Sequence, residues 1–109
     1  MSKEDLLKVL EDPRKQIIAV DCDGTLTRAT AWTEEEMRDA LPNKRIIAKV
    51  NELHKTGMVI IHTARRDEFY QVTKDWLDRN GVRYHAIVTG KLPASVYIDD
   101  NSLNIEDIV

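Results

Sequence analysis

Polar and charged residues follow each of four short apolar runs in this chain. In an α/β protein with parallel strands, the carboxyl ends of the strands meet at one edge of the sheet, and ligands bind there. We therefore expect the residues that follow the four runs to be neighbours in space. They are Asp21, Cys22, Asp23, Gly24, Thr25, Thr63, Arg65, Thr89, Gly90, Lys91, Asp99 and Asp100.

Four of these residues are aspartates, namely Asp21, Asp23, Asp99 and Asp100. Like charges a few ångströms apart cannot all stay ionised without compensation. A bound cation would supply it, and a set of oxygen ligands suits Mg²⁺. The four aspartates therefore predict a magnesium site at this edge of the sheet.

The remaining residues at this edge suit a phosphate group. Lys91 brings a fixed positive charge, and Thr63 brings a hydroxyl and a backbone N–H. The turn Asp23-Gly24-Thr25 can present N–H groups to an anion, because glycine allows close approach of the backbone. An aspartate can also act as a nucleophile in phosphoryl transfer through an aspartyl-phosphate. The combination predicts phosphate chemistry.

The elements that must position these residues follow from hydrophobic periodicity and from turn residues. Strands alternate with amphipathic helices, which predicts parallel βαβ units and an α/β fold. Pro42 suits the first turn of a helix, and Thr33 with Glu36 suits a helix cap. Strands are expected at residues 16–20, 58–62, 84–88 and 95–98, helices at 2–12, 33–40, 42–56 and 67–80, and one helical turn at 103–107.

Length and composition exclude several classes of protein. The 109 residues predict one domain over 1–109, in which residues 1–15 form an N-terminal helix that leads into the core. The net charge of −3 is spread evenly, so there is no basic patch for nucleic acid or for an anionic membrane. No apolar run approaches a membrane span, and no apolar signal core follows the charged first residues. One cysteine excludes an internal disulfide. We expect a cytoplasmic protein.

Four motifs in order resemble those of the haloacid dehalogenase (HAD) superfamily of phosphatases. Asp21-Cys-Asp-Gly-Thr-Leu-Thr looks like the first motif, and Ile60-Ile-His-Thr-Ala-Arg looks like the second. Lys91 looks like the third, and Val96-Tyr-Ile-Asp-Asp looks like the fourth. The resemblance implies a minimal HAD-like Rossmannoid fold. That fold is a three-layer sandwich around a mostly parallel sheet of about four strands.

The resemblance also implies a role for each matching residue. Asp21 would attack phosphorus, and Asp23 would protonate the leaving oxygen and then activate water. Mg²⁺ would be held by the Asp21 carboxylate, the Asp23 carbonyl and Asp100, while Asp99 would ligate through water or orient the others. The phosphate would be held by Thr63 and Lys91 and by backbone N–H groups of Cys22, Gly24, Thr25 and Ala64.

HAD enzymes usually carry a cap domain, for which this chain has no room. Residues 26–42 form a loop with one short helix, and residues 88–91 are too short for an insertion. The chain therefore resembles capless members. Three stretches, Thr63-Ala-Arg-Arg, Trp76-Leu-Asp-Arg-Asn-Gly-Val-Arg-Tyr and Gly90-Lys-Leu-Pro followed by Tyr97-Ile-Asp-Asp-Asn, are similar to capless phosphatases of bacterial capsular-polysaccharide gene clusters. This resemblance implies a sugar phosphate or a related small phosphorylated substrate. Either a large substrate or a neighbouring subunit of a homo-oligomer would then shield the site from water.

Four further residues need an interpretation of their own. Arg65 and Arg66 could contact substrate or form ion pairs with Asp67 or Glu68. Trp32 could line the substrate entrance or anchor its loop. Cys22 lies between the two aspartates and is expected to be a small buried side chain.

The leading hypothesis is a Mg²⁺-dependent phosphomonoester hydrolase. One alternative is a phosphate-binding regulatory module on the same scaffold, with negligible turnover. Another is a phosphatase for a macromolecular substrate. A receiver-like signalling domain is disfavoured, because the acidic pair of a receiver normally precedes the phospho-acceptor, whereas here Asp21 comes first.

Overall fold

The computed structural model describes residues 2, 4, 8 and 16–108. The helix predicted over 2–12 falls almost entirely outside the described residues. The strands are β1 (Ile17–Val20), β2 (Met58–His62) and β3 (Ala86–Val88), and the helices are α2 (Glu34–Asp39), α3 (Lys44–His54) and α4 (Tyr70–Arg79). Single helical turns lie at Asp67–Phe69 and Ile105–Asp107, and a turn with non-helical backbone angles at Asp23 and Gly24 lies at Cys22–Leu26.

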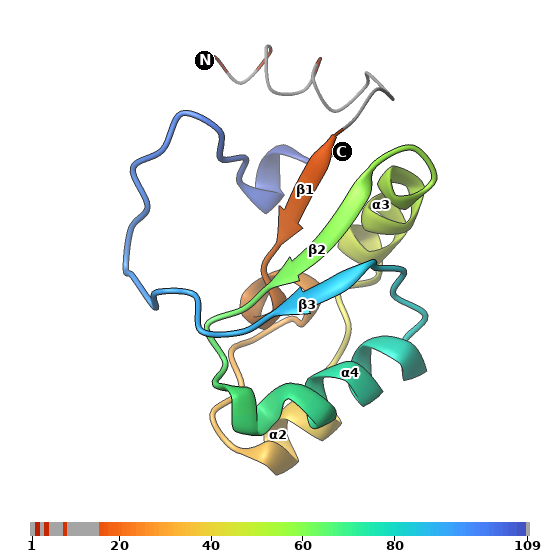
Figure 1. Ribbon diagram of the computed structural model, residues 1–109, viewed down its shortest axis with the longest axis vertical. Coiled ribbons are helices and arrows are strands. Elements are labelled where there is room, and N and C mark those ends of the chain that lie inside the picture. Colours follow the sequence, from red (N-terminus) through yellow and green to blue (C-terminus); the bar gives the residue numbers. More distant parts are fainter. Residues whose placement is uncertain (1, 3, 5–7, 9–15, 109) are drawn as a thin grey trace.

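The three strands form one parallel sheet in the order β1-β2-β3 (Figure 1). Val20 pairs with Ile61, and His62 pairs with Val88. The parallel pairing confirms the predicted βαβ arrangement, and it brings the carboxyl ends of the strands to one edge. In the part of the chain that the structure describes, β1 is an edge strand.

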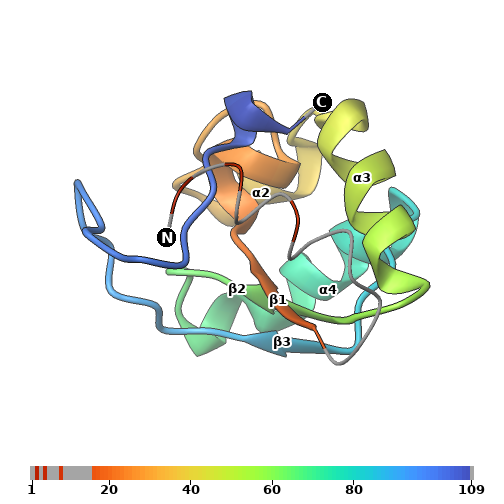
Figure 2. The same cartoon turned by 90° about the horizontal axis from the view of Figure 1, so that it is seen from above.

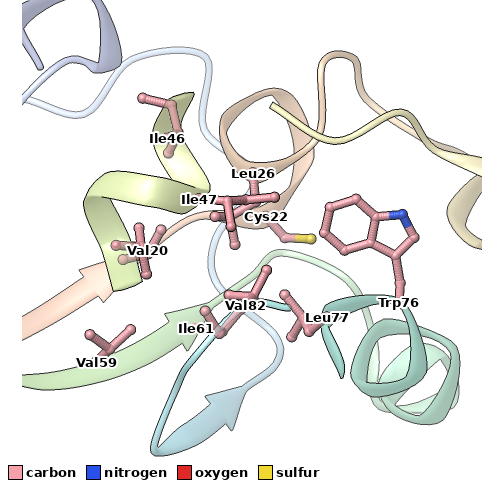
Figure 3. Packing of buried hydrophobic residues seen from close by; sticks show 11 residues of the cluster. Val20, Cys22, Leu26, Ile46, Ile47, Val59, Ile61, Trp76, Leu77 and Val82 are labelled. Atoms are coloured by element: carbon pink, nitrogen blue, oxygen red, sulfur yellow. The ribbon is translucent and has the colours of Figure 1, made fainter. Parts of the chain in front are cut away.

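One face of the sheet carries the core. Val59 and Ile61 are fully buried, whereas Met58 on the opposite face is 48% exposed, as the alternation of side chains along a strand requires. α2 and α3 lie on the same side of the strands in Figure 2. The described residues form two layers, and the third layer expected from the resemblance is not seen among them. The buried face packs against α3, α4 and the residues after α4 through Val20, Cys22, Leu26, Ile46, Ile47, Val50, Trp76, Leu77 and Val82 (Figure 3).

Two helices begin at side-chain caps. The Thr33 hydroxyl accepts from the Glu36 N–H, and the Glu36 carboxylate accepts from the Thr33 N–H, which confirms the predicted capping box. α3 starts two residues later than expected, because the Asn43 side chain caps it and Pro42 instead forms a β-bridge with Thr27. No helix in the described ranges has both the length and the apolar character needed to cross a membrane.

The helix predicted from residue 67 begins with a tight turn, Asp67–Phe69, and becomes α-helical at Tyr70. Trp76 is a core residue, and its indole N–H donates to the carbonyl of Ala40, 2.9 Å away. Phe69 is half-buried and packs against a second, smaller cluster. That cluster contains Ala31, Met37 and Val72, and it joins α2 to α4.

β3 is shorter than the predicted strand at 84–88, and His85 explains the difference. Its backbone N–H donates to the Val59 carbonyl, 2.8 Å away, and its Nδ1 accepts from the Val59 N–H at 3.0 Å. The imidazole nitrogen therefore accepts the hydrogen bond that a backbone carbonyl of the neighbouring strand would accept in a regular parallel ladder. The ring also stacks on His54 at the end of α3, with 4.3 Å between ring centroids.

The fourth strand predicted at Ser95–Ile98 is absent, and the segment loops away from the sheet (Figure 1). Val96 is 73% exposed and Ile98 fully exposed. Local hydrogen bonds explain the course of the chain: the Tyr97 hydroxyl bonds to Leu92 and Ala94, which folds the segment back on itself. Such local bonds compete with a strand ladder.

Candidate active site

Asp21 and Asp23 lie at the carboxyl end of β1, where the chain enters the turn Cys22–Leu26. Gly24 has a φ of 72°, a left-handed conformation that favours glycine. Cys22 and Leu26 point into the core and are fully buried, so the turn is anchored beneath the two aspartates. This confirms the expected burial of Cys22, and burial raises the pKa of its thiol to about 12, which leaves it unreactive.

Thr27 closes this turn. Its hydroxyl accepts from the Gly24 N–H at 3.1 Å and donates to the Ala29 carbonyl at 2.7 Å. The Gly24 N–H was expected to contact phosphate, but it is already used inside the protein. Gly24 therefore shapes the turn and does not offer a free donor.

Arg65 holds Asp23 with two hydrogen bonds. Its Nε donates to Asp23 Oδ2 at 3.0 Å and its terminal nitrogen to Oδ1 at 2.8 Å, while the Ala31 N–H also reaches Oδ1 at 3.3 Å. The other terminal nitrogen of Arg65 donates to the Thr73 hydroxyl on α4, at 2.9 Å. The Arg65 side chain is 2% exposed and that of Asp23 is 17% exposed. Arg65 thus links the end of β1, the end of β2 and α4.

One of the two interpretations of Arg65 was an ion pair with Asp67 or Glu68, but Arg65 pairs with Asp23 instead. Asp23 lies 42 residues away in the sequence, and only the parallel sheet brings the two together. Burial opposes the charge of Arg65, but the hydrogen bond and the nearby carboxylates outweigh it and raise the pKa of Arg65 above its ordinary value. For Arg66 the ion-pair interpretation holds, because its Nε lies 3.5 Å from Glu68 Oε1, with both side chains exposed.

Thr63 joins the second and third predicted motifs. It is fully buried, its N–H donates to the Val88 carbonyl, and its carbonyl accepts from the Lys91 N–H at 2.9 Å. Its hydroxyl oxygen accepts from the Arg65 N–H at 3.1 Å, so the hydroxyl hydrogen is available to donate elsewhere. These bonds fix the backbone of Lys91 at the same edge of the sheet as Thr63.

Asp21 is a partly buried carboxylate with a perturbed pKa. Burial raises the pKa of Asp21, and the charge of Asp23 adds to this effect. The positive charge of Lys91 opposes it most strongly, followed by a backbone hydrogen bond from Cys22 and the charge of Arg65. A carboxylate that is partly removed from water and compensated by a lysine is typical of a reactive group.

An open hollow of about 450 Å³ lies in front of the two aspartates. Asp21, Asp23, Gly24 and Thr25 form one side of it. Residues 103–106, at the start of the last helical turn, form the other side. Asn104 and Glu106 were missed as site residues, because in the sequence they read only as part of a helical turn.

The metal ligands predicted from the resemblance are not assembled. Asp99 and Asp100 are exposed in the loop that replaces the fourth strand, where Asp99 accepts from the Asn101 N–H at 2.7 Å. Within the described ranges, no three side chains of histidine, cysteine, aspartate or glutamate are arranged to hold a metal ion. The donor set of this conformation does not fit Mg²⁺.

Trp32 is 78% exposed and follows Ala31, whose N–H donates to Asp23. The indole therefore stands on the loop that contacts the candidate acid and is not packed as an anchor in the core. This placement leaves Trp32 available to a substrate, as one of its two interpretations requires.

A solved structure with a similar fold is the crystal structure of a structural genomics target from Vibrio cholerae. It is 28% identical to this chain, with a TM-score of 0.73, and the match covers 85% of this chain and 86% of that one. No protein-family model matches the sequence, and no curated protein matches it. The likeness supports a small α/β fold with a parallel sheet.

Proposed function

We propose that this protein is a HAD-type phosphomonoester hydrolase that depends on Mg²⁺ and reacts through an aspartyl-phosphate on Asp21. The observation that carries the proposal is the meeting of three strand ends. Four residues converge at one edge of the sheet: the partly buried Asp21, Asp23 two residues further along, Thr63 after β2 and Lys91 after β3.

The reaction has two steps on the groups of this chain. In the first, Asp21 attacks phosphorus, a bond forms from its carboxylate oxygen to phosphorus, and the bond to the leaving oxygen breaks while Asp23 supplies a proton. In the second, Asp23 takes a proton from water, whose oxygen attacks the aspartyl-phosphate and releases inorganic phosphate. Two separate groups suit these two steps, because one aspartate becomes phosphorylated while the other donates and accepts protons.

Asp23 must carry a proton in the first step, which bears on its contacts with Arg65. A carboxyl oxygen that carries a proton cannot accept a hydrogen bond along that O–H. Oδ1 accepts from both Arg65 and Ala31, whereas Oδ2 accepts only from the Arg65 Nε, so the second lone pair of Oδ2 would carry the proton. Thr63 and Lys91 would hold the phosphoryl oxygens, and Lys91 would offset the charge that gathers in the transition state.

The metal site requires the fourth strand. We propose that Ser95–Ile98 pairs in the active form with the edge of β1 that no described strand occupies, giving the four-stranded HAD-like sheet. A groove of about 990 Å³ runs beside β1, and its lining includes β1, part of α3 and residues of the last segment, among them Tyr97 and Asp99. Pairing there would cover the exposed Val96 and Ile98 and carry Asp99 and Asp100 to the end of β1 beside Asp21.

This pairing predicts slower amide hydrogen exchange at residues 95–98 when Mg²⁺ and vanadate are added together. Backbone amides in a strand ladder are protected, whereas those in an exposed loop are not. Residues 34–39 of α2, away from the groove, serve as the internal reference. Unchanged exchange at 95–98 with a saturating metal would contradict the fourth strand.

The hydrolase itself is tested by release of phosphate. Purified protein is incubated with p-nitrophenyl phosphate and with a panel of sugar, nucleotide and small organic phosphates, with Mg²⁺ or with EDTA. We expect turnover with Mg²⁺ that EDTA abolishes and that excess Mg²⁺ restores. Absence of phosphate release from every member of the panel would refute the proposal.

A phosphate-binding module without turnover is the second candidate. The observation that favours it is the double contact of Arg65 with Asp23, which occupies both oxygens of the proposed acid. Calorimetry with the same panel distinguishes the two, since binding without release of phosphate would support the module.

A further inference from the structure

The hollow in front of Asp21 has a second wall that the proposed reaction does not use. The first wall holds the reacting aspartates. A phosphoryl group within reach of Asp21 and Asp23 places the remainder of the substrate toward the opposite wall. That wall consists of Leu103, Asn104, Ile105 and Glu106. Its chemistry therefore bears on the leaving group and not on the phosphate.

The second wall is held in place by α3. The Arg45 guanidinium donates to the backbone carbonyls of Ile105 and Ile108, and both isoleucines pack against the main core. The Asn104 side chain accepts from the Glu106 N–H at 2.9 Å, which closes the turn. A wall anchored by a guanidinium, two apolar contacts and a side-chain cap presents its polar groups in a defined position.

The polar side chains of this wall are the Glu106 carboxylate, which is a negatively charged acceptor, and the amide of Asn104. The Asn104 oxygen is used within the turn, while the Glu106 carboxylate has no ion-pair partner among the residues that the structure describes. Within the same part of the chain, no lysine or arginine lines the hollow. A carboxylate there accepts hydrogen bonds from hydroxyl or ammonium groups, and it repels a second anionic group.

We propose that the Leu103–Glu106 wall is the leaving-group subsite of this enzyme and that Glu106 selects phosphomonoesters with a neutral, hydroxyl-bearing or cationic leaving group over those with an anionic one. The inference rests on the proposed function and narrows its substrate class. Leu103 and Ile105 offer an apolar surface beside the carboxylate, which suits the mixed faces of a polyol or sugar. In a chain without room for a cap, this wall supplies part of the selectivity that a cap would give.

The test compares two esters of similar size that differ in charge. Glycerol phosphate leaves a neutral alcohol, whereas phosphoglycerate leaves one with a carboxylate. The ratio of kcat/KM for glycerol phosphate to that for phosphoglycerate is measured for the wild type and for Glu106→Gln. Glu52→Gln, which removes the same charge from an exposed position on α3, is the matched control.

We expect Glu106→Gln to lower this ratio by about fivefold, mainly by improving the reaction of phosphoglycerate, since an exposed charge pair is worth only a modest factor. Glu52→Gln should leave the ratio unchanged. An unchanged ratio in a Glu106→Gln enzyme that still turns over both esters would overturn the subsite and leave the hydrolase standing. Absence of phosphate release from the wild type with either ester and with the wider panel would overturn both proposals.

Discussion

Replacement of Asp21 by asparagine is expected to abolish phosphate release and, at the same time, to make the folded protein more stable. Asparagine keeps the size of the side chain but is not a nucleophile. Removal of a nucleophile on which the covalent step depends lowers kcat by at least about 10³-fold. The measurement is release of phosphate with Mg²⁺ from the best ester of the panel.

The gain in stability follows from the environment of Asp21. Burial raises the pKa of Asp21 above 3.8, so the folded state bears the cost of a partly desolvated charge at neutral pH. That cost is fully present above the folded-state pKa. It disappears as pH falls through that pKa to below the unfolded value. The asparagine side chain carries no charge, so the advantage of Asp21→Asn over wild type should be largest at neutral pH and should vanish below about pH 4.

Thermal unfolding in EDTA measures this difference without a contribution from bound cations. We expect the melting temperature of Asp21→Asn to exceed that of wild type by a few degrees at neutral pH and to converge with it in acid. Asp39→Asn, an exposed change at the end of α2, is the control and should shift neither activity nor stability. A variant that is inactive and also less stable at neutral pH would indicate that Asp21 supports the fold and not the chemistry.

The sequence predicted the elements well where a local rule determined them. The Thr33 and Glu36 pair specified the start of α2, and the continuous apolar run at residues 58–61 specified β2 to the residue. The helix predicted to end at residue 80 ends at Arg79 with Asn80 as its cap, and Gly81, with a φ of 71°, follows it. In these places the information lies within a few residues, which is the range over which such patterns are informative.

Prediction failed where contacts distant in sequence decide the outcome. Ser95–Ile98 has the composition of a strand, but a strand exists only if an edge accepts it, and in this structure Tyr97 bonds locally instead. The pairing of Arg65 with Asp23 depends on topology, because the two residues follow adjacent parallel strands, whereas helix spacing relates Arg65 only to its neighbours in the sequence. Nothing in the sequence pattern placed Glu106 opposite Asp21, since that placement depends on Arg45 and on the packing of Ile105.

Arg65→Leu is expected to destabilise the protein by about 3 kcal/mol, because loss of one partner leaves a partly buried carboxylate without compensation. Asp23 would lose two hydrogen bonds and Thr73 would lose one. The measurement is the free energy of unfolding in urea at neutral pH. Arg66→Leu is the matched control, since its pair with Glu68 is exposed on both sides and should contribute at most about 0.5 kcal/mol.

The double variant Asp23→Asn/Arg65→Leu separates a lost ion pair from a lost side chain. If the penalty comes from an uncompensated charge, removal of the Asp23 charge should recover part of the loss. If Arg65 mainly fills space, the double variant should remain as unstable as Arg65→Leu alone.

Arg65→Lys tests the positioning role, because lysine keeps the charge but cannot hold both oxygens of a carboxylate. We expect kcat to fall while KM changes little, since Asp23 acts on the leaving oxygen and not on binding. If Arg65→Lys left kcat unchanged and Arg65→Leu left the free energy of unfolding unchanged, the Arg65–Asp23 contact would be incidental to both the reaction and the fold.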